Sequence, residues 1–291
     1  MDNTIPITFP TDWIDYELID SGEGAKLERF GDYTISRPDP RAIWLRHASQ
    51  EVWQNADAQY IRSSKESGDW KIVREPPIDW HLTYNGLKFN LKPTSFKHVG
   101  VFPEQAVNWD WIGNKLKASN QKRVLNLFAY TGGATLASAK AEATVTHVDS
   151  SQSSIHWAKE NAAASGLSQS PIRWILDDVS KFVNREIRRG NTYDAIILDP
   201  PRFGRGTKGE VWKLDDNLTS LLTLCKQLIS NNPLFIILNA YTADLSSIAL
   251  DNTLRDVMND GIVETMELTI KDTTSERLLP HGIISRWTPA P

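Results

Sequence analysis

The sequence predicts an α/β fold, a mainly parallel sheet with helices on both faces, preceded by a small β-rich domain. Two observations lead to this prediction. From about residue 122, short apolar runs alternate with segments of helical periodicity, and the runs are almost continuously apolar, as in strands buried on both faces. Residues 1 to about 95 are instead rich in Trp, Tyr, Pro and Gly, with short alternating segments. We therefore predict a β-rich N-terminal domain at 1–95 and a second domain at 96–291.

Composition and charge limit the classes of protein to consider. The chain has 291 residues, of which 40% are hydrophobic and 23% charged, enough for a sizeable core. Its one cysteine, Cys225, rules out intramolecular disulfides and cysteine-rich zinc sites, so we expect no metal. Without an apolar run of membrane-span length or a signal-peptide pattern, we expect a cytoplasmic protein. The net charge of −4 argues against a protein that coats nucleic acid through bulk charge.

In the N-terminal domain, alternating segments at 33–36, 42–45 and 87–91 predict strands. Asn85-Gly86 lies between two such runs, which is a strong signal for a β-hairpin. We therefore predict a small antiparallel β module. Most of its Trp side chains should form its core, although some could stack on nucleic-acid bases.

The second domain is predicted to alternate strands and helices. The predicted strands are 123–128, 144–148, 172–176, 193–198 and 234–238, followed by 263–270 and 282–287 as an antiparallel hairpin on one edge. The predicted helices are 134–141, 151–164, 179–189, 214–228 and one near 244–259. Gly166 and Gly190 stand where a left-handed residue usually ends a helix.

Polar residues follow the strands, and in an open α/β sheet ligands bind at the carboxyl ends of the strands. The first strand is followed by Gly132-Gly133, which can be a simple tight turn or a close approach to a ligand. Asp149 ends the second strand, about 20 residues after the start of the glycine loop, as in sites where an acid accepts hydrogen bonds from a ribose. It could also cap the next helix. Either Asp177 or Asp178 could accept from an adenine amine, while the other caps a helix.

The glycine loop argues against a dinucleotide. A Gly-x-Gly-x-x-Gly fingerprint is absent, so fewer backbone donors are available for a pyrophosphate. A cofactor with an adenosine but no phosphate fits better.

Four motifs in order resemble those of one enzyme family. They are the segment Asn126 to Gly133, Asp149, Asp178-Val179 and the segment Leu198-Asp-Pro-Pro-Arg-Phe203. Together they resemble the class I S-adenosylmethionine (SAM) dependent methyltransferases of the bacterial 23S ribosomal RNA large-subunit type. The likeness covers about 97–291, including Leu279-Pro-His-Gly282. It implies a Rossmann-like seven-stranded sheet with one reversed strand.

The resemblance also implies roles for particular residues. Asp149 would hold the ribose hydroxyls of SAM and Asp178 the adenine amine. The segment 100–105 is similar to the family's Phe-x-Asp-Gln element, with Glu104 in place of the Asp, so Glu104 and Gln105 would contact SAM. The loop that would hold the methionine part of SAM includes Asn126, Phe128, Tyr130, Thr131, Gly132 and Gly133.

The segment after the fourth strand is the candidate transfer site. By similarity to Asx-Pro-Pro-aromatic elements of amine methyltransferases, Asp199, Pro200 and Pro201 would hold a planar nitrogen and Phe203 would stack on the base. Methyl transfer is an in-line displacement, so positioning carries most of the rate, and the cofactor brings the reactive group. The alternative, purely structural roles are a stiff loop for the two prolines and a position in the hydrophobic core for Phe203.

Family members that methylate cytosine C5 use a cysteine after the fifth strand, where this chain has Asn239-Ala-Tyr-Thr242. We therefore expect a nucleophilic target such as a nitrogen, and an inert core position for Cys225. Arg202, Arg205 and Lys208 could bind RNA phosphates, or could simply form a solvated loop. The leading hypothesis is methylation of an RNA base, possibly in ribosomal RNA. The alternatives are a protein or small-molecule methyltransferase and a non-catalytic SAM- or RNA-binding module.

Overall fold

The computed structural model describes residues 5–63, 68–120, 122–206, 209–242 and 244–290. Contacts along the chain divide it into two units. The sheet unit comprises Met1–Thr8, Val107–Leu268 and Gly282–Pro291, and the β-rich unit comprises Phe9–Ala106 and Thr269–His281. Residues 96–106 and 269–281 thus group with the β-rich unit, while Met1–Thr8 groups with the sheet unit. The boundary at 95/96 stays a prediction about which segments fold independently.

The sheet unit is built on an eight-stranded sheet in the order β1-β16-β17-β15-β12-β9-β10-β11. The strands of this sheet are β1 (Ile7–Thr8), β9 (Arg123–Leu127), β10 (Thr144–Asp149), β11 (Ile172–Leu176), β12 (Ala195–Leu198), β15 (Phe235–Ala240), β16 (Ile262–Lys271) and β17 (Leu278–Thr288). Residues 269–271 of β16 and 278–281 of β17 are counted with the β-rich unit. Strands β9, β10, β11, β12 and β15 pair in parallel, and β17 runs antiparallel to β15. This is the predicted sheet with one addition: the short β1 pairs with β16, so β1 and not the β16–β17 pair forms that edge.

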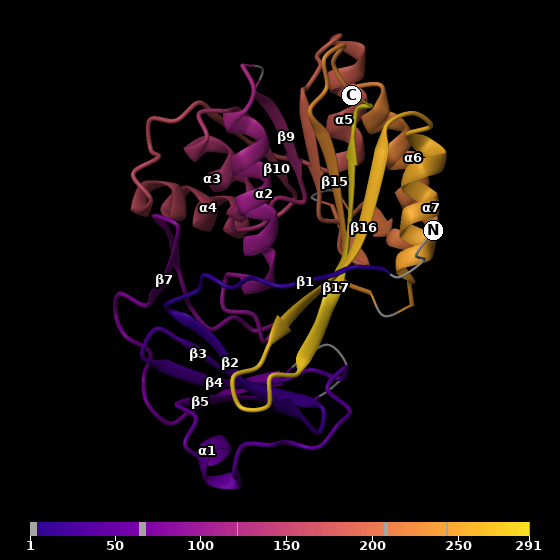
Figure 1. Cartoon of the computed structure of the whole chain (residues 1–291). Helices are drawn as coiled ribbons and strands as arrows, with labels where there is room; N and C mark the ends of the chain where they lie inside the picture. The colour runs from indigo at the N-terminus through magenta and orange to yellow at the C-terminus, as the bar shows by residue number, and fades with distance from the viewer. Residues whose placement is uncertain (1–4, 64–67, 121, 207–208, 243, 291) are drawn as a thin grey trace. The chain divides into compact units, whose positions relative to one another are not determined.

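Alternate strand residues enter two hydrophobic clusters, because successive side chains of a strand point to opposite faces. In β12, Ile196 and Leu198 belong to one cluster, and Ala195 and Ile197 to the other. The first cluster packs against α5 (Val179–Arg188), α6 (Leu214–Lys226) and α7 (Ser247–Val257). The second packs against α2 (Ala106–Lys117) and α3 (Gly133–Lys140). Figure 1 shows these two sets of helices on opposite faces, with α4 (Gln152–Ala164) beside α3.

The helix ends follow the predicted rules. Ser151 caps α4 by accepting a hydrogen bond from the Ser154 backbone N–H. Gly166 and Gly190 have φ values of +72° and +69°, in the left-handed region that favours glycine. Both glycines were predicted at these positions.

The β-rich unit contains a five-stranded sheet in the order β2-β3-β4-β5-β6 and a separate hairpin, β7–β8. Its elements are β2 (Tyr16–Gly22), β3 (Ala25–Phe30), β4 (Tyr33–Pro38), α1 (Gln50–Gln54), β5 (Ala58–Arg62), β6 (Gly68–Ile72), β7 (His81–Tyr84), β8 (Leu87–Asn90) and the 3-10 turn Pro103–Gln105. The predicted hairpin at Asn85-Gly86 is confirmed, with φ values of +45° and +72° at the turn. The module is not wholly antiparallel, because β4 and β5 pair in parallel.

One predicted strand of this unit, 42–45, is wrong. Asp39 accepts hydrogen bonds from the backbone and side chain of Arg41, and Ala42 bonds back to the Asp39 carbonyl, so the chain turns here. Ile43 is therefore 86% exposed rather than part of a sheet.

The tryptophans of the β-rich unit mainly hold this unit together. Each indole N–H donates a hydrogen bond within the unit, either to a backbone carbonyl or to Asp20; the residues are Trp13, Trp44, Trp53, Trp70 and Trp80. Their structural role follows from these bonds.

Candidate functional site

The loop after β9 has a backbone that few sequences adopt. Phe128 and Tyr130 have φ values of +57° and +47°, although neither is glycine. Each such residue costs on the order of 1 kcal/mol or more, and such strain gathers at functional sites. Gly132, with φ +92°, completes the turn into α3. The loop is thus held in an unusual shape at the carboxyl end of β9.

Buried polar side chains support this loop through hydrogen bonds. Asn126 Nδ2 donates to Thr135 Oγ1 at 2.9 Å, and Thr135 Oγ1 lies 3.0 Å from His147 Nδ1. Burial lowers the pKa of His147 to about 3, so this ring is neutral at physiological pH. The buried Asn161 on α4 donates to the Thr131 carbonyl at 3.0 Å. The side chain of Asn126 is thus engaged within the core, and its contact with a cofactor stays a prediction.

Sequence reasoning missed Asn161. Its signal was a polar residue on the apolar stripe of a helix, three and six residues after the buried Ala158 and Ile155. A buried amide must find hydrogen-bond partners, so such a position indicates a loop to be held.

Gly133 is required for packing. A Cβ on this residue would lie 2.6 Å from Cζ2 of the Trp109 ring, which is itself buried. A side chain here would displace either the ring or the start of α3. Gly132-Gly133 is therefore more than a simple turn, because one glycine supplies the backbone conformation and the other the space.

Asp149 is fixed at the end of β10. Its two carboxylate oxygens accept hydrogen bonds from the backbone N–H groups of Tyr130 and Ser151, each at 2.8 Å. Burial raises the pKa of Asp149, and these backbone bonds oppose the shift. Since Ser151 is the cap of α4, Asp149 is not the N-cap that the sequence left open. Its carboxylate instead joins the glycine loop to the end of the neighbouring strand.

Of the two acids after β11, Asp178 caps the next helix. Its Oδ1 accepts from the Lys181 backbone N–H at 2.9 Å. Asp177 forms an ion pair with Arg185 and accepts from the Asp178 backbone N–H. The cap bond is made by one carboxylate oxygen of Asp178, so a ligand contact through the other is compatible with the geometry, and its contact with adenine stays a prediction.

The segment after β12 is held by a hairpin that the sequence did not predict. Asp199 donates its backbone N–H to the Leu127 carbonyl, next to the glycine loop. The Pro201 carbonyl accepts a hydrogen bond from Trp212 Nε1 at 2.7 Å. Trp212 belongs to β14 (Val211–Lys213), which pairs with β13 (Phe203–Arg205). The Phe203 side chain is 54% exposed, so the core position considered for it is wrong.

The predicted basic residues differ in their surroundings. Arg202 forms an ion pair with Asp244, and both side chains are more than half exposed. Arg205 is exposed on β13. Lys208 lies outside the described residues.

Glu104 and Gln105 belong to the β-rich unit. Both lie in the 3-10 turn Pro103–Gln105 and are buried, Glu104 being 1% exposed. Glu104 Oε1 is buried, and the described part of the chain offers it no hydrogen bond. An unpaired buried oxygen is costly and points to a missing partner. Their contact with SAM stays a prediction.

Cys225 is fully buried in the cluster beneath α6, and burial raises the pKa of its thiol far above the usual range. A thiol that stays protonated is a poor nucleophile, so the expected core role is confirmed. At the position after β15, Asn239 is buried and accepts from Asn108 at 3.0 Å.

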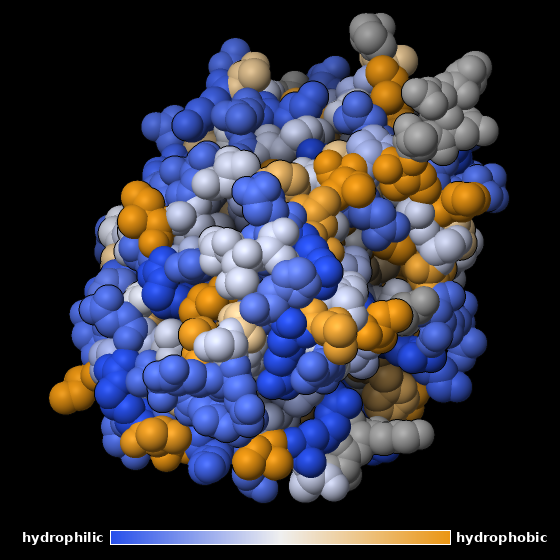
Figure 2. Space-filling view, turned by 60° about the horizontal axis from the view of Figure 1, so that its bottom comes forward, coloured by the Kyte–Doolittle hydropathy of each residue, from blue (hydrophilic) through white to orange (hydrophobic). Residues whose placement is uncertain are grey.

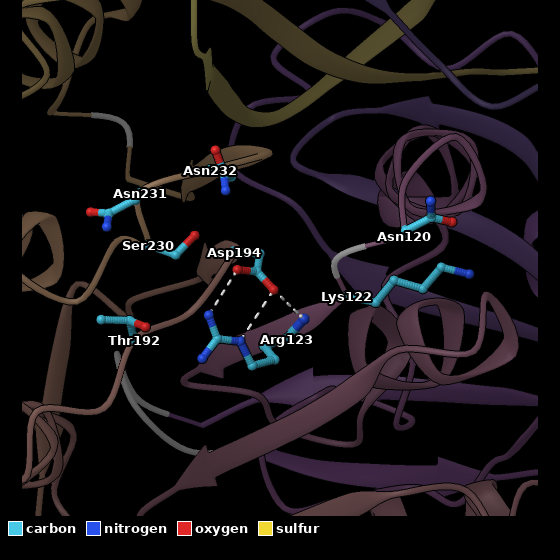
Figure 3. Close-up of a pocket in the computed structure, with 8 residues that line it drawn as sticks. All are labelled: Asn120, Lys122, Arg123, Thr192, Asp194, Ser230, Asn231 and Asn232. Carbon is cyan, nitrogen blue, oxygen red and sulfur yellow. Dashed lines mark hydrogen bonds and ion pairs between the residues drawn. The ribbon is translucent and has the colours of Figure 1, made fainter.

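A polar pocket of about 490 Å³ lies near the amino ends of the central strands β9 and β12 (Figure 3). Its lining residues are Asn120, Lys122, Arg123, Thr192, Asp194, Ser230, Asn231 and Asn232. Its buried acid, Asp194, accepts from both the backbone and the guanidinium of Arg123, so the pair ties the two strands together. Ligands of open α/β sheets bind at the opposite, carboxyl ends. The pocket is therefore not the candidate site.

The described residues contain neither a metal-binding cluster nor a membrane-spanning helix. No group of three or more His, Cys, Asp or Glu side chains there is arranged to hold a metal ion. No helix in that same part of the chain has the length and apolar character to cross a bilayer. On the face shown in Figure 2, hydrophobic residues form small groups among hydrophilic ones.

The described residues fit SAM. The loop from Asn126 to Gly133 contains no Lys or Arg to neutralise a pyrophosphate. Its strained backbone and the fixed carboxylate of Asp149 lie at the carboxyl ends of adjacent strands, β9 and β10. A cofactor with ribose hydroxyls and no phosphate matches that set of groups.

Comparisons with known proteins identify the family of the chain. The family model described as "S-adenosylmethionine-dependent methyltransferase" matches residues 36–272. The chain is 34% identical to the ribosomal RNA large subunit methyltransferase K/L of Shewanella frigidimarina over 240 residues, which are 81% of this chain and 32% of that protein. The chain thus spans about a third of the length of that relative.

Solved structures show the same fold. A SAM-dependent methyltransferase from Agrobacterium tumefaciens matches with a TM-score of 0.91 and 43% identity, covering 100% of this chain and 98% of the other. A putative SAM-dependent methyltransferase from Streptococcus mutans matches with a TM-score of 0.72 and 19% identity, covering 94% and 76%. The second likeness shows the fold alone. With the family model matching most of its length, the chain belongs to the S-adenosylmethionine-dependent methyltransferases.

Proposed function

We propose that this chain transfers a methyl group from SAM to a nitrogen of an RNA base, with ribosomal RNA as the substrate. One observation carries the proposal. The order of strands in the sheet, β12-β9-β10-β11, brings Asp199, the glycine loop, Asp149 and Asp178 to the carboxyl ends of four neighbouring strands. The name of the Shewanella relative supports the ribosomal substrate.

In this proposal, the loop from Asn126 to Gly133 holds the methionine part of SAM, and Asp149 accepts hydrogen bonds from the ribose. Each Asp149 oxygen already accepts one backbone N–H, and a carboxylate oxygen can accept a second bond. Asp178 accepts from the adenine amine through the oxygen that does not cap α5. SAM supplies an electrophilic methyl group on a cationic sulfur.

The target nitrogen is held at the segment from Asp199 to Phe203. The Asp199 carboxylate accepts an N–H of the target, and Pro200 and Pro201 restrict the backbone around it. The exposed ring of Phe203 stacks on the base. The target nitrogen would take the methyl group in one displacement, in which the bond from the methyl carbon to sulfur breaks as the bond to nitrogen forms and the N–H proton passes to the Asp199 carboxylate. Such a displacement needs no cysteine nucleophile, and the chain has none after β15.

Cationic side chains next to this segment would hold the RNA backbone. Arg202, Arg205 and Lys208 follow directly after the two prolines. We further propose that the protein acts in the cytoplasm, where its RNA substrate is found. Because the net charge of the chain is −4, recognition of RNA would depend on this local group of cations and not on the charge of the whole surface.

A second candidate, methylation of a protein side chain or a small molecule, is favoured by the net charge of −4. Incubation with methyl-labelled SAM and separated RNA, protein and metabolite fractions distinguishes the two. The proposal predicts label in RNA, and nuclease digestion should recover it on a base nitrogen. Label only in protein or metabolites contradicts the RNA proposal. Binding of SAM without transfer to any fraction would indicate a non-catalytic module.

A further inference from the structure

The hairpin of β13 and β14 has two different faces. The strands pair antiparallel, with Phe203 opposite Lys213, Gly204 opposite Trp212, and Arg205 opposite Val211. Burial alternates along both strands, so the middle pair faces inward and the outer two pairs face solvent. This alternation assigns separate tasks to the two faces.

The inward face attaches the hairpin to the transfer segment. Trp212 is 8% exposed, donates to the Pro201 carbonyl and packs against Phe128, with 5.0 Å between the ring centroids. The Leu214 backbone N–H donates to the Arg202 carbonyl at 2.9 Å. The outward face is therefore held in a definite position next to Asp199-Pro-Pro201.

The outward face combines apolar and cationic groups. Phe203 and Val211 are 54% and 55% exposed, and Arg205 and Lys213 are also exposed. Each of the two outward-facing pairs, Phe203–Lys213 and Arg205–Val211, joins one apolar residue to one cation. The hairpin's acid, Glu210, pairs with Lys181.

Lys213 forms an ion pair with Asp216, but this pair is weak. Lys213 lies 3.4 Å from Asp216, but both side chains are about 60% exposed, at 59% and 64%. Such a pair contributes at most about 1 kcal/mol and leaves the cation available to a stronger partner.

Resting on the proposed function, we infer that the outward face of this hairpin binds the single-stranded RNA next to the target base. Arg205 and Lys213 contact phosphates, and Val211 packs against the neighbouring ribose or base. Bases and phosphates alternate along RNA, and apolar and cationic side chains alternate on this face. The complementary charge favours RNA, and the attachment through Trp212 places the face beside the site of transfer.

The test uses the full chain and in vitro transcribed 23S ribosomal RNA. The double variant Arg205→Ala/Lys213→Ala should raise the KM for RNA about tenfold and lower the salt dependence of binding by about two phosphate contacts. Val211→Ser should raise KM without changing the salt dependence. The Kd for SAM should equal that of the wild type in all variants. Lys159→Ala, an exposed lysine on α4, is the matched control.

Three results would overturn the inference. If the wild type methylates RNA while the double variant keeps its KM and salt dependence, the hairpin does not bind RNA and the proposed function stands. An equal loss in Lys159→Ala would show a general charge effect, which also contradicts the inference. If the wild type binds SAM but does not methylate RNA, the proposed function fails and the inference with it.

Discussion

The indole nitrogen Nε1 of Trp212 lies 2.7 Å from the carbonyl oxygen of Pro201, to which it donates a hydrogen bond. The same ring contacts Phe128 in the glycine loop. One side chain therefore touches both the proposed cofactor loop and the proposed transfer segment. This relationship makes Trp212 a positioning residue rather than one that meets the substrate.

Replacing this indole by a ring without the N–H tests that role. We expect Trp212→Phe to keep the contact with Phe128 but release the Pro201 carbonyl, so that kcat falls on the order of tenfold while the Kd for SAM stays within about twofold. Steady-state turnover assays measure kcat, and titration calorimetry measures the Kd for SAM. A fall in melting temperature with kcat unchanged would assign Trp212 to stability alone.

The packing role of Gly133 in the glycine loop can be tested by substitution, with Gly113 in α2 as the control position. Gly133→Ala should lower the free energy of unfolding by about 1–3 kcal/mol and weaken SAM binding, because its Cβ would meet Trp109. Gly113 lies within α2, and a Cβ there would meet open space, so Gly113→Ala should stabilise by about 0.5–1 kcal/mol. Urea unfolding measures both. Equal effects of the two substitutions would contradict the packing argument.

Asp199 is expected to act in transfer and not in cofactor binding. Asp199→Ala should retain SAM affinity and lower kcat on the order of 100-fold, because the target nitrogen loses its acceptor. Glu160→Ala, on the exposed surface of α4, should leave kcat at the wild-type value. Normal turnover in Asp199→Ala would remove this residue from the site.

Acid stability of the β-rich unit should depend on Glu28. Burial raises the pKa of this carboxyl, but Arg37 and then Lys26 outweigh burial and lower it to about 2. A depressed carboxyl pKa stabilises the fold above the unfolded value of about 4.5 and loses that effect as the pH falls toward 2. Melting temperatures between pH 7 and pH 2 should therefore fall more steeply in the wild type than in Glu28→Gln.

A further prediction at pH 7 and one control accompany this profile. At pH 7, Glu28→Gln should be less stable by about 3–5 kcal/mol, because Arg37 and Lys26 would lack a buried counter-charge. Glu276→Gln, at a mostly exposed glutamate, should follow the wild type throughout. Parallel profiles of Glu28→Gln and the wild type would show that the ion pair carries no such pH dependence.

Much of the sheet unit could be predicted because its strands are short apolar runs ended by characteristic residues. The predicted strand 123–128 is observed as Arg123–Leu127, and 172–176 matches β11 as observed. Asp149 and Asp199 stand at strand ends because the pattern that forms a buried strand also marks where it stops.

Other features depend on contacts that periodicity does not contain. The strands of β13 and β14 have three residues each, too few for an alternating pattern to stand out, so Trp212 was not connected with Pro201. The two-residue β1 is defined by pairing with β16 alone. The sequence limits the helix caps to a few candidate residues. Only the backbone geometry shows that Ser151 caps α4 and Asp178 caps α5.

The most direct test of the proposed cofactor site is calorimetry of SAM binding to the wild type and to Asp149→Ala. The substitution removes the carboxylate that accepts from Tyr130 and, in the proposal, from the ribose, so the Kd should rise by about tenfold or more. Glu142→Ala, at an acid that is 88% exposed, is the control and should bind SAM as the wild type does. Unchanged SAM affinity in Asp149→Ala, or a wild type that binds NAD in place of SAM, would contradict the account.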